Sequence, residues 1–244
     1  MPWTRPLAVV TLVVAVAAAG PALAQHVTVD LGNDASLAAR SIQLITLVTL
    51  LSLAPGLAVM VTCFPFVVTV LSLLRQAMGL QQSPPNMVIV SLALFLTWFV
   101  MDPVFTRAWQ DGVQPLMDGN IAIEAAVPAV VTPFRGFMAL RVDPQTFATL
   151  RELRPADAAV AMADAPLSLL VPSFMLSEIQ RAFEIGFLIY LPFLIIDLVV
   201  AAVLMSMGMM MVPPAAVSMP FKLAFFVIAD GWTLVASALV RGYG

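Results

Sequence analysis

The chain has 244 residues, of which 61% are hydrophobic and only 10% are charged, and its formal net charge is −3. Its mean hydropathy of +1.02 lies outside the usual range of soluble domains, and the acidic balance gives no support for a basic nucleic-acid-binding surface. Between Ser41 and Met101 the only charged side chain is Arg75. Uncharged apolar stretches of this length are typical of membrane-spanning helices, so the composition predicts an all-α integral membrane protein.

The first 24 residues (1–24) have the pattern of a secretory signal peptide. Arg5 supplies the positive start, Leu7 to Ala19 the apolar segment, and Ala22-Leu23-Ala24 the cleavage motif. An uncleaved anchor is the alternative, but the apolar segment is short for a span. Cleavage leaves residues 25–40 outside the cytoplasm as a polar lead that we expect to be mobile. The predicted location is a bacterial inner membrane that faces a periplasm.

Residues 41–105 predict a first helical hairpin. The apolar run from Ile42 to Leu74 is too long for one simple span of about 20 residues. Pro55-Gly56 and Pro65 fall inside this run, which predicts a kinked or broken helix.

A second span is expected from Met87 to Met101, closed by Asp102-Pro103. Residues 106–168 then change character, because charged side chains become frequent and prolines separate short amphipathic pieces. Strand-like alternation is absent, so this segment predicts a small helical insert outside the membrane. The signal peptide places the insert in the periplasm.

Residues 169–244 predict a second kinked hairpin. Its third span follows Pro172-Ser173 and contains Pro192, and its fourth span runs from Phe221 to Leu239. Between them lies the stretch Met205–Pro214, with five methionines in seven residues and then two prolines, which we call the methionine bend. Broken helices at membrane depth persist where other protein satisfies the freed backbone groups, so the chain is expected to lie within an assembly.

Charged residues in or beside the apolar segments are candidates for function or assembly, because each is costly in a membrane unless it is paired. They are Arg75, Glu178, Asp197, Lys222 and Asp230. A proton or ion relay is one interpretation, and pairing between helices is the other. We favour pairing, since the carboxylates are far apart in sequence with no histidine between them. Lys222 is the only lysine, and Glu178 is its expected partner, within a subunit or between subunits.

No catalytic, cofactor or metal site is expected. His26 and Cys63 are the only residues of their types, so a zinc site lacks a ligand set. The sequence contains no G-x-S-x-G motif and no glycine-rich phosphate loop. The chain is therefore not expected to be an enzyme.

Three interpretations of the methionine bend stay open at this point. Methionine is a common apolar gap filler, so simple packing is one. Thioethers are soft ligands suited to Cu(I), although no Cys or His joins them here. The third is a deformable apolar plug, formed if several subunits bring the bend together around an axis. The candidate pore-gate residues are Met207, Met209, Met210 and Met211.

Several motifs together point to a known family. In the second hairpin they are Leu169-Leu-Val-Pro-Ser-Phe-Met-Leu-Ser-Glu178, Met207-Gly-Met-Met-Met-Val-Pro-Pro214 and Asp230-Gly-Trp232. In the first hairpin they are Leu74-Arg-Gln-Ala-Met-Gly79 and Pro84-Pro-Asn86. With these motifs the chain resembles the FliP/SctR family, the export-gate proteins of flagellar and virulence type III secretion. The signal peptide is more similar to the flagellar branch. One departure is Thr62-Cys63-Phe64-Pro65-Phe66, where the family commonly has an arginine at the last position.

The resemblance implies a pore for unfolded secreted proteins at the flagellar basal body in the inner membrane. It implies five copies of the chain, together with several copies of a small two-helix export-gate subunit (FliQ-like) and one larger subunit (FliR-like). It also implies that the apparent spans are held by protein neighbours, that the methionine loops line the closed constriction, and that Glu178 and Lys222 belong to subunit contacts. A Cu(I)-handling membrane protein is the alternative function.

Overall fold

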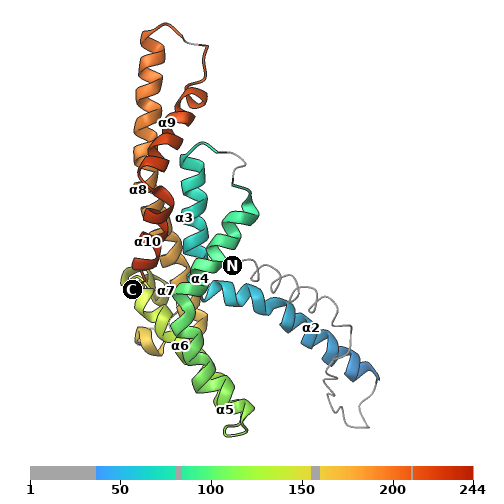
Figure 1. Cartoon of the computed structure of the whole chain (residues 1–244). Coiled ribbons are helices and arrows are strands. Elements are labelled where there is room, and N and C mark those ends of the chain that lie inside the picture. The colour runs from blue at the N-terminus through green and yellow to red at the C-terminus, as the bar shows by residue number, and fades with distance from the viewer. Residues whose placement is uncertain (1–36, 81–83, 155–159, 210, 244) are drawn as a thin grey trace, which may run out of the picture. The chain divides into compact units, whose positions relative to one another are not determined.

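The computed structural model describes residues 37–80, 84–154, 160–209 and 211–243 (Figure 1). These residues form helices and connecting turns without a strand, which confirms the all-α prediction. The predicted signal peptide lies outside the described residues, as does most of the polar lead. The chain divides into two units, Met1–Leu50 and Leu51–Gly244, and each is described by itself.

The described helices are α2 (Leu37–Met60), α3 (Phe64–Ala77), α4 (Asn86–Ala108), the π-helical turn η1 (Trp109–Val113), α5 (Gln114–Met117), α6 (Ile123–Arg141), α7 (Pro144–Glu152), the 3-10 turn η3 (Met162–Asp164), α8 (Leu167–Ser206), α9 (Pro214–Ile228) and α10 (Gly231–Arg241).

Helix α2 is predominantly apolar, and its described side chains from Ser41 to Thr49 are exposed. It continues through Pro55-Gly56, so the helix is not broken there. Proline and glycine are tolerated inside apolar helices of this kind. The chain breaks instead at residues 61–63, directly before α3. Pro65 lies in the first turn of α3, where its missing N–H has no helical partner to lose, and it helps to begin this helix.

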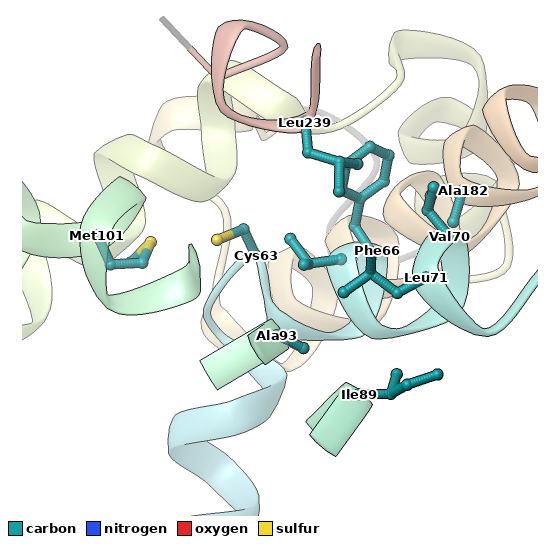
Figure 2. Packing of buried hydrophobic residues seen from close by; sticks show 10 residues of the cluster. Cys63, Phe66, Val70, Leu71, Ile89, Ala93, Met101, Ala182 and Leu239 are labelled. Atoms are coloured by element: carbon teal, nitrogen blue, oxygen red, sulfur yellow. The ribbon is translucent and has the colours of Figure 1, made fainter. Parts of the chain in front are cut away.

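Helix α3 lies at the centre of the first hydrophobic cluster, because it packs against both α4 and α8. Its buried face recurs at helical spacing through Phe66, Val70 and Leu74. Gly186 of α8 allows the close approach, since a Cβ there would lie 2.2 Å from Leu73 Cδ1. Figure 2 shows side chains of this cluster from four helices: Phe66, Val70 and Leu71 from α3, Ile89, Ala93 and Met101 from α4, Ala182 from α8 and Leu239 from α10.

Helix α4 does not end at Asp102-Pro103 as expected. It runs through Pro103 to Ala108 and continues into η1 and α5. Packing against α6 supports the helix beyond the proline: the rings of Phe105 and Phe134 have centroids 5.8 Å apart. In η1, Gly112 lies against Val130 of α6, where an added Cβ would come within 2.5 Å of Val130 Cγ2. Tertiary contacts thus outweigh the local cost of Pro103.

The described part of the segment between the two predicted hairpins consists of helices joined by short turns. Helix α6 leads to α7, which Asp143 caps: the Asp143 Oδ2 atom accepts a hydrogen bond of 2.7 Å from the Thr146 N–H. These helices and the start of α8 enclose the second hydrophobic cluster. Its buried members are Met138, Val142, Phe147, Ala165, Leu169, Leu170 and Phe174.

Helix α8 is a single helix of 40 residues that includes both Pro172 and Pro192. The fourth span is not the continuous helix expected from Phe221 to Leu239, because α9 and α10 meet at an angle of 62°. Asp230 lies at this joint with a left-handed backbone (φ 49°, ψ 48°), which ends α9. Among the described residues, four helical segments are long and apolar enough to cross a membrane, or five if α9 and α10 count as one broken span. The four segments are Ser41–Met60, Asn86–Met117, Ile123–Arg141 and Leu167–Ser206.

Candidate functional site

The methionine bend begins with a well-formed end of helix α8. The Gly208 N–H donates to the Met205 carbonyl and the Met209 N–H to the Leu204 carbonyl, both at 3.0 Å. With Gly208 at φ 74°, this is the Schellman arrangement, in which a glycine takes the left-handed position after the helix. Pro213 and Pro214 then begin α9. The bend is therefore held by backbone geometry at both ends, and Figure 1 shows it at the tip of the α8–α9 hairpin.

The described methionine side chains of the bend are exposed. Met207 is 67% exposed, Met209 41% and Met211 99%. Met210 lies outside the described residues. These side chains give the bend an exposed apolar surface.

The structure adds no ligand to the copper interpretation. Among the described residues, no group of three or more His, Cys, Asp or Glu is placed to hold a metal ion. Cys63, the single cysteine, is fully buried in the first hydrophobic cluster. Its burial raises the pKa of the thiol to about 12, so it is also a poor source of thiolate.

Lys222 pairs with Asp197, not with Glu178. Its Nζ atom lies 2.6 Å from Asp197 Oδ2 and donates to the Ala77 carbonyl at 3.0 Å. The Ser218 hydroxyl donates to Asp197 Oδ1 at 2.5 Å. The pair thus joins α9 to α8 and also caps the last turn of α3. The expected Glu178–Lys222 pair is wrong within the chain.

Glu178 lies in a second ionic cluster, with its side chain fully buried. Its Oε1 atom accepts from Arg141 Nε at 3.1 Å and lies 3.3 Å from Arg181 Nη1. The Tyr243 hydroxyl donates to Oε2. Arg141 also donates to the Gly242 carbonyl at 2.6 Å, and its guanidinium lies 4.1 Å from the centre of the Tyr243 ring. This cluster joins α6, α8 and the residues after α10.

Burial and the neighbouring Glu178 charge raise the pKa of Tyr243, so its phenol stays protonated and donates its hydrogen bond. Sequence reasoning missed Tyr243 and Arg141, which lie far from Glu178 in the chain. Arg181 could have been found, because three residues separate it from Glu178 on a helix.

Arg75 and Asp230 have local roles in the structure. Arg75 donates to the Asn86 side chain and, at 3.3 Å, to the Pro84 carbonyl, so it joins the end of α3 to the start of α4. The Asp230 Oδ1 atom accepts from the Thr233 hydroxyl at 3.1 Å in the first turn of α10. Within the described part of the chain, neither residue forms one of the ion pairs expected of the charged candidates.

Comparison with known proteins gives a consistent result. A family model described as the FliP family matches residues 47–239. A flagellar biosynthetic protein FliP from Caulobacter vibrioides is 49% identical, over 98% of this chain and 91% of the relative. The protein of the same name from Agrobacterium fabrum is 47% identical, over 96% of this chain and 98% of the relative. The protein of the same name from Bacillus subtilis is 40% identical, over 90% of this chain and 99% of the relative.

Proposed function

The chain belongs to the FliP family, and from this premise we propose that it forms the wall and closure of a pore for unfolded flagellar proteins. Family membership makes it a component of the flagellar export apparatus in the bacterial inner membrane. In the proposed pore, the assembled chains surround a path for extended polypeptide and close it when no substrate is present.

The exposed methionine bend carries this proposal. Met207, Met209 and Met211 project from a turn whose backbone is fixed by Gly208 and two prolines. Repeated around an axis, such side chains form an apolar constriction that excludes water and ions. Unbranched thioether side chains can also re-pack around polypeptides of varied sequence. Met210 belongs to the proposed closure by its place in the sequence.

A pore requires several subunits, and the exposed apolar surface supports this requirement. Phe95, Trp98 and Phe99 of α4 are each more than 60% exposed, as are Leu188 and Leu198 of α8. We propose that five copies assemble, with FliQ-like and FliR-like subunits and lipid covering the remaining apolar faces. We place the segment of residues 106–168 on the periplasmic side, with its apolar helix Ile123–Arg141 held by protein neighbours and not by lipid. The energy for transport comes from partners, since the proposed role of the chain is non-enzymatic.

A leak measurement tests the closure. Replacing Met207, Met209, Met210 and Met211 together by Ala should make the purified, assembled gate conduct ions in a planar bilayer. Met87→Ala is the matched control, because Met87 is 80% exposed but lies on α4, away from the bend. A quadruple variant that assembles normally and stays non-conducting would contradict the proposal. Loss of Cu(I) binding without a leak would favour the copper alternative.

A further inference from the structure

Helix α9, which follows the methionine bend, is held by a narrow row of side chains. Only Ser218, Lys222 and Phe226 are buried among its described residues, and they follow one another at intervals of four. We call these three residues the α9 seam. Such spacing places them on a single stripe of the helix. Neighbouring apolar side chains are exposed, with Phe221 at 59% and Val227 at 75%.

Two of the three seam residues make polar contacts. Ser218 and Lys222 both bond to Asp197, and Lys222 also reaches the Ala77 carbonyl. Phe226 is its only apolar member. It lies in the third hydrophobic cluster with Leu74, Ala77, Met78 and Phe193, and its ring centroid is 6.3 Å from that of Phe193 and 5.4 Å from that of Trp232. Outside the seam, the Phe225 ring centroid also lies 6.1 Å from that of Phe193. The Asp197 side chain remains 30% exposed, so water can replace its bonds. If the seam were entirely apolar, separating α9 from α8 would expose only hydrocarbon, and water could not replace any lost hydrogen bond.

The other end of α9 is a strained joint. Asp230 has φ 49°, a conformation that L-residues other than Asn and Asp rarely take and that favours glycine. Gly231 follows, and its missing Cβ leaves room for the Phe226 ring, which would lie 2.2 Å from an added Cβ. Straightening the joint would return Asp230 to the right-handed region and move Phe226 with α9. The far end of α10 is held by the Glu178 cluster through Gly242 and Tyr243.

From these contacts we propose that α9 is a movable arm, which separates from α8 at the α9 seam and turns about Asp230 while α10 stays fixed. The methionine bend is continuous with α9, so its position follows the arm. The link to gating rests on the proposed function, whereas the motion itself does not. The strained joint favours opening, and the Lys222–Asp197 pair favours closure.

Two buried serines provide a matched test of this motion. Ser218 in the seam and Ser173 in the packed part of α8 are both fully buried, and each is changed to Cys in a Cys63→Ala background. In the purified full complex, N-ethylmaleimide should modify S218C about tenfold faster than S173C, because local opening exposes only the seam. Equal rates for the two thiols would overturn the proposal.

Variants of Asp230 test the joint. Asp230→Gly removes the strain of the bent state and should slow the modification of S218C several-fold. Asp230→Ala increases the strain and should speed it, while Asp230→Asn, which tolerates the left-handed region, should leave it unchanged. Changes of the same size at S173C would overturn the assignment of the joint.

If a cysteine variant fails to assemble, hydrogen exchange on the complex without substitutions tests the same motion. Amides of residues 219–227 should exchange earlier than those of residues 174–186, and joint exchange of both segments would overturn the proposal. Failure of the proposed function can be distinguished from failure of this motion, because only the former is detected by a quadruple methionine variant that does not leak.

Discussion

The two ionic clusters on α8 differ in how completely they are enclosed. Glu178 is fully buried and has three partners, from α6, α8 and the residues after α10. Asp197 is 30% exposed, and its partners Ser218 and Lys222 both come from α9. The two acids are about 28 Å apart along the helix at 1.5 Å per residue. The difference indicates a fixed base at one end of α8 and a releasable contact towards the methionine bend.

The largest effect is expected at the enclosed cluster. Glu178→Gln removes the charge that Arg141 and Arg181 share, and it leaves two guanidinium groups without their carboxylate. The loss of stability should be about 3–5 kcal/mol, as for other broken buried pairs. Unfolding in detergent measures it. Glu184→Gln is the control, because Glu184 is exposed and bonded only to Gln180 in the described structure, and it should change little.

A smaller effect is expected at the seam. Lys222→Met keeps the length of the side chain and leaves Asp197 without its cation, but water can reach that carboxylate. The loss of stability should be about 2–3 kcal/mol, which includes the bond to the Ala77 carbonyl. Hydrogen exchange should locate the loss in α9 and spare α6. If Lys222→Met destabilises the chain as much as Glu178→Gln does, the distinction between the two clusters fails.

These pairings also show what the sequence could and could not predict. Long uncharged runs define the helices, and the methionine bend is visible as a string of residues. One proline was misleading, because Pro103 lies inside a helix that packing against α6 sustains. The sequence predicts the wrong partner for Lys222. Glu178 and Asp197 are both carboxylates in apolar surroundings, and only the fold shows that Asp197 is the one within reach of α9. Tyr243 has no local signal at all, because its partners come from helices formed much earlier in the chain.

A substitution at the joint between α9 and α10 also tests whether the α9 seam can loosen while the Glu178 cluster stays intact. Gly231→Ala places a Cβ within 2.2 Å of the Phe226 ring, which would have to leave the seam. Overpacking of this kind should cost about 1–2 kcal/mol and loosen α9 without affecting the Glu178 cluster. Gly136→Ala is the control: it lies inside α6 with no atom within 4 Å of the added Cβ. It should be neutral or stabilising. Thermal unfolding and thiol modification of S218C measure the two effects, and equal outcomes for both glycines would contradict the expectation.

The smallest effect is expected at the start of α7, which packs near the enclosed cluster. Hydrogen bonds from the Thr146 N–H and hydroxyl lower the pKa of Asp143 below its ordinary value of 3.8. Because the folded pKa is below the unfolded one, its contribution to stability is present above about pH 4 and is lost as the pH falls through the folded pKa. Asp143→Ser should keep a helix cap and remove this part of the acid dependence. Unfolding from pH 6 down to pH 2 measures the difference, and parallel curves for the two proteins would show that Asp143 does not supply it. A dependence confined to α7, with the α9 seam unchanged in hydrogen exchange, would show that the Asp143 cap and the release of α9 are independent.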